Sequence, residues 1–206
     1  WRTILVMTIA IPQFVSLLYV SKLFTTSGLI GRVLEQIPFI HNWRVANNFV
    51  SLWDSPTVAK ILLIVINIWI GIPYIMLMAT GILMNIPQDL YESAKIDGAS
   101  SVQQFTKITL PYMLFVTGPY LLTSFVGNLN NFNVIYLLTG GGPSTSDFYQ
   151  AGYTDILVTW LFKLSMTQQD YALAAAIGIL VFIVCASLSL IVFNMSKSMK
   201  DEEAFS

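Results

Sequence analysis

Four long apolar stretches dominate the pattern of hydrophobic and polar positions along the chain. They contain no Asp, Glu, Lys or Arg and cover residues 3–21, 61–84, 108–130 and 171–193. Each is close to the length of about 20 apolar residues that a helix needs to cross a bilayer. The pattern therefore predicts an all-α, polytopic membrane protein with about four transmembrane helices.

Three of these predicted spans contain a proline within the apolar run. Pro12 lies in the first, Pro73 follows Gly71 in the second, and Gly118-Pro119 interrupts the third. Membrane helices tolerate such breaks where neighbouring helices satisfy the freed backbone groups, and transporters place substrate sites at broken helices. Ordinary packing kinks explain any single break equally well, so the prolines alone do not define a site.

The distribution of Lys and Arg orients the spans. With four spans, both chain ends and residues 85–107 lie on one side, and each side carries five basic residues. The loops on that first side are roughly half as long, so their positive charge is denser, which favours the cytoplasm. We therefore expect residues 85–107 to be cytoplasmic and residues 24–57 and 131–170 to be external.

The two external segments have different patterns. Residues 131–138 form an apolar run too short to span, which indicates a re-entrant or partly inserted segment, and the glycines and proline of residues 140–143 end it. Residues 151–166 have helical periodicity and are expected to lie along the outer membrane face. The lone His41 belongs to residues 24–57, where a surface role is the simplest interpretation.

Composition supports a membrane protein and excludes several other classes. The 206 residues are 55% hydrophobic and only 10% charged, whereas soluble domains carry about 25% charged residues. The net charge of −1 gives no indication of nucleic-acid binding, and the single Cys185 excludes a disulfide framework and a cysteine metal site. No cofactor is expected. Because the chain starts at Trp1 without a methionine, we expect it to be the C-terminal part of a longer protein.

A polar insert separates the second and third spans. Pro87 is suited to a helix start, Asp89 and Glu92 have the spacing of a capping pair, and Gly98 is suited to a left-handed helix end. A second short helix is expected to lead from residue 100 into the third span. Such a compact, capped hairpin can enter a groove on a soluble partner, although an ordinary interfacial connector would have the same pattern.

The insert also carries a family resemblance. Glu92-Ser-Ala-Lys-Ile-Asp-Gly-Ala99, followed by Ile108-Thr-Leu-Pro111, resembles the EAA signature of ABC importer permeases, with serine for the middle alanine. The resemblance implies that residues 88–104 form coupling helices that seat in the cleft of a cytoplasmic ATPase subunit. The residues implied in this coupling are Glu92, Ser93, Ala94, Asp97, Gly98 and Ala99.

Four further stretches resemble the MalF-type permease subunits of maltose and maltodextrin importers: residues 67–74, 124–132, 136–143 and 151–155. The likeness covers essentially the whole chain and implies a type I (MetI-like) permease core in the bacterial inner or plasma membrane, with residues 1–206 as one transmembrane domain. It also implies four partners: a second, MalG-type permease, two copies of a cytoplasmic ATPase, an extracellular sugar-binding protein and the sugar itself. The chain itself is then not an enzyme.

Polar residues within the spans are suited to an uncharged sugar. Amides and hydroxyls can hydrogen-bond sugar hydroxyl groups, and unpaired amides in hydrocarbon are costly, so they should face a polar cavity or each other. Asn67, Gly71 and Tyr74 follow one another at helical spacing in the second span and so share a face, and Ser124, Asn128 and Asn131 repeat this spacing in the third. These six residues, together with Gln13 of the first span, are the candidate sugar-binding residues. Hydrogen bonding between helices is the alternative role. Gly127 replaces an aromatic residue of the family, which suits a roomier pocket.

Two absences in the sequence narrow the function. The glycines of residues 140–142 are not followed by Gly-Lys-Ser/Thr, so they do not form a nucleotide-binding P-loop. The four spans contain no ionisable Asp, Glu, Lys or Arg, which weakens a proton-coupled carrier. We therefore expect an ATP-driven maltose or maltodextrin importer that works by alternating access. The alternatives are a permease for another oligosaccharide or glycerol phosphate, a secondary carrier without an ATPase, and a purely structural subunit.

Overall fold

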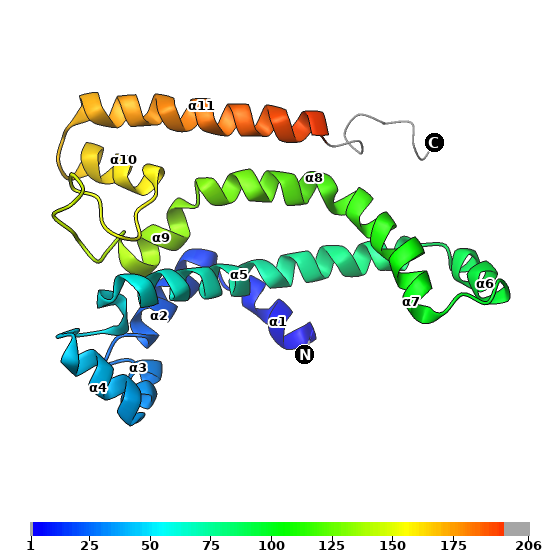
Figure 1. Cartoon of the computed structure of the whole chain (residues 1–206), viewed down its shortest axis with the longest axis horizontal. Coiled ribbons are helices and arrows are strands. Elements are labelled where there is room, and N and C mark those ends of the chain that lie inside the picture. The colour runs from blue at the N-terminus through cyan, green and yellow to red at the C-terminus, as the bar shows by residue number, and fades with distance from the viewer. Residues whose placement is uncertain (1, 196–206) are drawn as a thin grey trace. The chain divides into compact units, whose positions relative to one another are not determined.

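The computed structural model describes residues 2–195, and these are helical nearly throughout (Figure 1). The longest helices are α5 (Pro56–Asn85), α8 (Leu110–Leu129) and α11 (Tyr171–Met195). In this part of the chain, three helical stretches are long and apolar enough to cross a membrane, and they coincide with the second, third and fourth predicted spans. The all-α membrane class predicted from the sequence is therefore confirmed.

The first predicted span is not one continuous helix. Residues 3–21 fall into α1 (Arg2–Met7), a short 3-10 helix (Thr8–Ala10) and α2 (Gln13–Leu23). Ile11 between them is extended, with φ −94° and ψ 130°. This break follows from Pro12, because a proline disfavours the helical region for the residue before it. The interruption that the sequence places at Pro12 is therefore a complete break of the helix, and neither α1 nor α2 is by itself long enough to span a bilayer.

The described residues fall into two compact units. The first comprises the chain up to Gly71 together with Leu129–Val184, and the second comprises Ile72–Asn128 together with the chain from Cys185 onward. Helices α5 and α11 each contribute residues to both units.

The first unit has a core formed by α2, α5 and α9 (Phe132–Thr139). Its buried members are Leu17, Leu63, Ile66, Val134 and Leu138. The hydroxyl of Ser21 donates to the carbonyl of Leu138 at 2.7 Å, and the indole N–H of Trp53 donates to the carbonyl of Ser21 at 3.1 Å. These contacts hold the short α9, which is too brief to span a bilayer, against α2.

Residues 24–57 of the same unit form α3 (Leu29–Glu35), α4 (Pro38–Ala46) and a 3-10 turn (Leu52–Asp54). The Arg44 guanidinium forms an ion pair with Glu35, and His41 Nδ1 lies 2.8 Å from the same carboxylate. Hydrogen bonding to Arg44 and then to His41 holds the pKa of Glu35 below its ordinary value. His41 is therefore part of a surface polar cluster, in agreement with the surface role expected from the sequence.

A second cluster in the first unit joins α10 (Leu157–Met166) to α11. Leu164 of α10 packs with Ala174 and Ile177 of α11, and all three are buried. The helix predicted over residues 151–166 is found only from Leu157 onward. Its start is fixed by Thr159, whose hydroxyl accepts from the backbone N–H of Ile156 at 3.0 Å.

In the second unit, the segment after α5 forms the expected helical hairpin. Helix α6 (Gln88–Ile96) is followed by α7 (Ser101–Gln104), a π-helical turn (Phe105–Thr109) and α8. The Tyr91 hydroxyl lies 2.8 Å from the Thr109 hydroxyl, which joins α6 to the start of the span. The hairpin is therefore attached to α8 by a side-chain hydrogen bond as well as by the continuous helical backbone.

Candidate functional site

The predicted coupling segment, residues 88–104, turns at Gly98. Gly98 has a φ of +78°, which places it in the left-handed region. Its N–H donates to the carbonyl of Lys95 at 3.0 Å, and the N–H of Ala99 donates to the carbonyl of Ala94 at 2.9 Å. These two bonds form a Schellman motif, which satisfies the last carbonyls of α6. The left-handed helix end predicted at this glycine is confirmed.

The start of α6 differs from the expectation. Pro87 occupies the N-cap position and no side chain caps the helix, so the capping pair predicted at Asp89 and Glu92 was wrong. The capping box lies at the next helix instead. The N–H of Gln103 donates to the Ser100 hydroxyl at 3.3 Å, and the N–H of Ser100 donates to the Gln103 side chain at 2.8 Å. The Ser-x-x-Gln spacing was a sequence signal for this box.

A concavity of about 370 Å³ lies in the turn between α6 and α7. Its lining includes four of the six predicted coupling residues, Ala94, Asp97, Gly98 and Ala99. The lining also includes Gln103, Gln104, Lys107 and Ile108, so the hollow presents both signs of charge beside small residues. The other two predicted coupling residues, Glu92 and Ser93, are exposed on α6 outside this lining. The structure thus gathers part of the predicted set.

Two of the predicted sugar-binding residues meet in the first unit. The side-chain amide of Asn131 donates to Asn67 Oδ1 at 2.9 Å, which joins the start of α9 to α5. The Asn131 oxygen also accepts from the N–H of Val134 at 3.4 Å and caps α9. Both asparagines are half-buried, and Gly71 lies one turn beyond Asn67 on α5. Asn131 therefore holds the Asn67 side chain as well as being a candidate ligand itself.

The second unit contains Ser124 and Asn128 of the second helical set. Asn131 was predicted to continue that set on the same helix, but α8 ends at Leu129 and Asn131 caps α9 in the first unit, so this part of the prediction was wrong. The Asn128 amide donates to the carbonyl of Ser124 at 2.8 Å, so these two residues of α8 share a face, as their spacing predicted. Tyr74 of α5 lies against Tyr120 of α8, with ring centroids 5.0 Å apart and an interplanar angle of 37°. The sequence analysis did not select Tyr120. Its position one turn before Ser124 was the available signal, and its contact with Tyr74 is seen only in the structure.

The remaining candidates lie apart from these contacts. Gln13 is the first residue of α2 and is exposed. Gly127 has no atom within 4 Å of where a Cβ would be, and it borders an apolar groove of about 550 Å³ between α8 and α11. The groove is lined by Leu122, Thr123, Val126, Gly127, Ser189, Leu190 and Phe193. There is therefore open space beside Gly127, as expected for a roomier pocket, but the groove it borders is lined mostly by apolar side chains.

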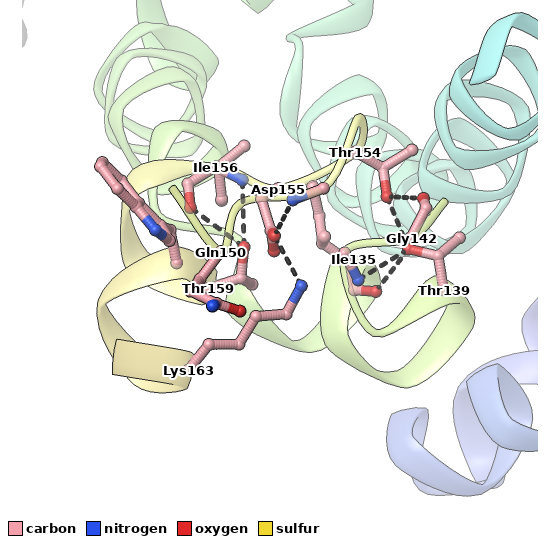
Figure 2. Close-up of polar contacts among 12 residues, drawn as sticks. Ile135, Thr139, Gly142, Gln150, Thr154, Asp155, Ile156, Thr159 and Lys163 are labelled. Atoms are coloured by element: carbon pink, nitrogen blue, oxygen red, sulfur yellow. Dashed lines mark hydrogen bonds and ion pairs between the residues drawn. The ribbon is translucent and has the colours of Figure 1, made fainter. Parts of the chain in front are cut away.

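A charged cluster that the sequence did not reveal lies between α9 and α10 (Figure 2). Lys163 Nζ lies 2.6 Å from Asp155 Oδ2, and the Asp155 side chain is only 2% exposed. The N–H of Gly152 donates to the same oxygen at 2.7 Å. The hydroxyl of Thr154 donates to the carbonyl of Gly142 at 2.5 Å and lies 2.8 Å from the Thr139 hydroxyl. Only 10% of the residues are charged, so the proximity of Asp155 and Lys163 in the sequence was the available signal for this ion pair.

Comparison with protein families decides the class. Residues 1–201 match the family described as "Binding-protein-dependent transport system inner membrane component". The chain belongs to this family. The chain is 40% identical over 206 residues to the maltodextrin transport system permease protein MdxF of Bacillus subtilis (strain 168). This alignment covers 98% of this chain and 47% of that protein. The resemblance to MalF-type permeases is therefore confirmed.

Two further members of this family show comparable similarity. The galactooligosaccharides transport system permease protein GanP of Bacillus subtilis (strain 168) is 40% identical over 209 residues, with 98% of this chain and 47% of that protein covered. The maltose/maltodextrin transport system permease protein MalF of Escherichia coli (strain K12) is 38% identical over 196 residues, with 93% and 37% covered. The chain therefore spans about half the length, or less, of these curated relatives.

A solved structure shows the same fold. A chain of the bacterial alginate ABC transporter, crystallised in complex with an alginate pentasaccharide-bound periplasmic protein, aligns with a TM-score of 0.69 at 24% identity. The alignment covers 90% of this chain and 60% of that chain. The ABC importer permease fold expected from the sequence is thus confirmed.

Proposed function

We propose that this chain is the membrane-embedded core of an ATP-driven importer that carries maltose or maltodextrins by alternating access. The observation that carries the proposal is the 40% identity to a maltodextrin permease across 98% of the chain. Identity at this level over nearly the whole chain supports a shared transport role rather than a shared fold alone.

ATP hydrolysis belongs to a separate partner in this proposal. Two cytoplasmic ATPase subunits drive the cycle, and one of them seats the coupling segment through the hollow formed at Gly98. Small residues permit close approach there, while Asp97 and Lys107 provide polar contacts. A second permease subunit completes the pathway, and an external binding protein delivers the sugar, as the periplasmic protein in the related alginate structure suggests by analogy.

The sugar contacts proposed for this chain combine amides and aromatic rings. Asn67 and Asn131 offer amide groups to sugar hydroxyls, and their mutual hydrogen bond removes the cost of leaving these amides unpaired before sugar arrives. The ring faces of Tyr74 and Tyr120 suit the apolar faces of pyranose rings. Ser124 and Asn128 add polar groups at helical spacing on α8. The chemistry of each of these sets, taken by itself, suits a neutral oligosaccharide.

A galactooligosaccharide is the second candidate substrate, because the galactooligosaccharide permease is also 40% identical to this chain. An anionic polysaccharide such as alginate would need positive charge near the sugar, and the spans at residues 61–84, 108–130 and 171–193 contain no Lys or Arg. The same reason disfavours glycerol phosphate.

Transport competition tests the substrate. The complete transporter is reconstituted in proteoliposomes, and uptake of labelled maltotriose is measured against unlabelled maltose, maltotetraose, glucose and a β-1,4-galactooligosaccharide. We expect the maltodextrins to inhibit maltotriose uptake by half at a concentration at least tenfold lower than the galactooligosaccharide requires. The reverse order would assign the chain to galactooligosaccharide transport instead.

A variant pair tests the role of Asn67. We expect Asn67→Ala to raise the maltotriose concentration for half-maximal uptake about tenfold, the effect of losing about 1.4 kcal/mol of binding free energy. Asn85→Ala is the matched control, because Asn85 lies at the end of the same helix and its side-chain amide donates to the carbonyl of Gly81. Equal behaviour of the two variants would remove Asn67 from the sugar site.

A further inference from the structure

A π-helical turn separates the predicted coupling segment from the main length of α8. It comprises Phe105–Thr109, between α7 and α8, and the N–H of Leu110 donates to the carbonyl of Phe105, five residues back. π-Helical turns inside α-helices are rare, occur frequently at functional sites and are preferred places for a helix to bend. Figure 1 shows that the chain reaches α8 from α6 through α7, so this turn lies on the path between the hairpin and the span.

A side-chain hydrogen bond crosses this turn. The Tyr91 hydroxyl of α6 lies 2.8 Å from the hydroxyl of Thr109, the last residue of the π-helical turn. Thr109 is only 8% exposed and Tyr91 is half-buried, so the bond is stronger there than it would be in water. The Tyr91–Thr109 bond therefore connects α6 directly to the start of α8, in addition to the backbone path through α7.

Three further sets of hydrogen bonds hold the hairpin together, and all lie before the π-helical turn. The bonds at Gly98 close the end of α6, and the capping box of Ser100 and Gln103 begins α7. The Gln104 amide donates to the carbonyl of Ala99 at 3.1 Å. These bonds join α6 to α7, whereas the Tyr91–Thr109 bond joins the hairpin to the far end of the turn.

We propose that Tyr91 and Thr109 are positioning residues that transmit movement of the predicted coupling segment to α8. This inference rests on the proposed function, in which an ATPase subunit moves residues 88–104. Residues 86–87 between α5 and α6 are not helical, and the π-helical turn is the preferred bending point on the other side of the hairpin. Without the bond, these two places can absorb the movement of α6. With the bond, α6 and the start of α8 move together.

The amount of sugar carried per ATP tests this role. Tyr91→Phe keeps the ring and removes only the hydroxyl, and the complete transporter carrying it is assayed in proteoliposomes for labelled maltotriose taken up and for ATP hydrolysed. We expect the ratio of maltotriose to ATP to fall about fivefold, or about 1 kcal/mol, the contribution of one hydrogen bond. A purely structural role would lower uptake and hydrolysis together and leave this ratio unchanged, which would overturn the proposal.

Variants of Thr109 test whether the two hydroxyls act through one bond. Thr109→Val should lower the ratio as much as Tyr91→Phe, and the double variant should lower it no further, because both changes remove the same interaction. Thr109→Ser keeps the hydroxyl and should retain at least about half of the wild-type ratio. Thr106→Val is the matched control, because it removes a hydroxyl from the same turn that donates to the carbonyl of Val102 on its own helical segment at 2.9 Å. Additive losses in the double variant, or an equal loss in Thr106→Val, would overturn the proposal.

A distance measurement separates the hydrogen bond from the transport function. Nitroxide labels at Gln88→Cys of α6 and Leu114→Cys of α8, in a Cys185→Ser background, report the spread of distances between the two helices by double electron–electron resonance in nanodiscs. Both labelled positions are exposed. Tyr91→Phe should broaden this distribution, and an unchanged distribution would overturn the proposal even where transport falls. If the wild-type transporter couples no uptake to ATP, the proposed function fails, whereas the distances still test the Tyr91–Thr109 bond.

Discussion

Replacing Lys163 by methionine tests whether the buried ion pair fixes the loop between α9 and α10, residues 140–156. Methionine keeps an unbranched apolar chain of similar reach but removes the ammonium that lies 2.6 Å from Asp155 Oδ2. The Asp155 carboxylate would then stay buried with one hydrogen bond from the N–H of Gly152, since its Oδ1 has no hydrogen-bond partner. A buried charge left without its counter-ion is the expected source of instability.

The size of the effect follows from the geometry of the pair. At 2.6 Å and an effective dielectric constant of about 20, the attraction between the two charges is about 6 kcal/mol. The Lys163 side chain is 24% exposed, so water screens part of this attraction, and the ammonium regains hydration when the pair opens. Breaking one partner of a buried pair usually costs about 3–5 kcal/mol, and partial exposure places this case near 3 kcal/mol.

Hydrogen exchange of the loop amides measures this change locally. We expect the Gly152, Tyr153 and Thr154 amides of Lys163→Met to exchange about 100-fold faster than in the wild type, as a loss of about 3 kcal/mol implies. Adding Asp155→Asn removes the stranded charge and should restore most of the protection.

Lys60→Met serves as the control. Lys60 Nζ lies 5.9 Å from the centre of the Tyr153 ring and Lys60 is exposed. Removing its charge should therefore change the exchange rates of the same amides by less than about fivefold. Unchanged protection in Lys163→Met, or no recovery in the double variant, would refute the reasoning that the ion pair holds the loop.

Three other predictions concern separate parts of the chain. Gly98→Val should cost at least about 1–2 kcal/mol at the φ of +78°, and should reduce ATPase association and transport in pull-down and uptake assays; unaltered association would contradict the coupling role. Asn131→Asp keeps the oxygen that caps α9 but loses the donor to Asn67, so the maltotriose concentration for half-maximal uptake should rise with α9 intact; an unchanged value would leave Asn131 a cap only. Because the pKa of folded Glu35 is lowered, its stabilisation of the α3–α4 hairpin should be complete above about pH 4.5 and be lost as pH falls through the lower folded value; a thermal midpoint independent of pH in this range would argue against it.

The sequence predicted those parts of the fold that depend on local chemistry. Three spans were found because length and hydropathy alone identify a membrane helix. The sequence also placed an interruption at Pro12, but only the structure shows that it divides residues 3–21 into separate short helices, with Ile11 outside the helical region. Gly98 was predicted correctly, since a left-handed helix end requires a residue without a Cβ.

Contacts in the candidate site between residues far apart in the sequence could not be predicted. Helical spacing identified Ser124 with Asn128, because both lie on one helix. The hydrogen bond between Asn67 and Asn131 and the ion pair between Asp155 and Lys163 depend on how separate elements pack, which no spacing rule contains. The role proposed for residues 88–104 comes from the family resemblance, because physical chemistry alone left open whether they form a docking element or an ordinary connector.

Uptake into proteoliposomes tests the central claim most directly. The complete transporter is reconstituted with labelled maltotriose and the sugar-binding protein outside and ATP inside, and each component is then omitted in turn. An ATP-driven importer predicts uptake only when both ATP and the binding protein are present, and no uptake when an ion gradient replaces ATP. Uptake driven by the ion gradient alone, without ATP or binding protein, would contradict the account.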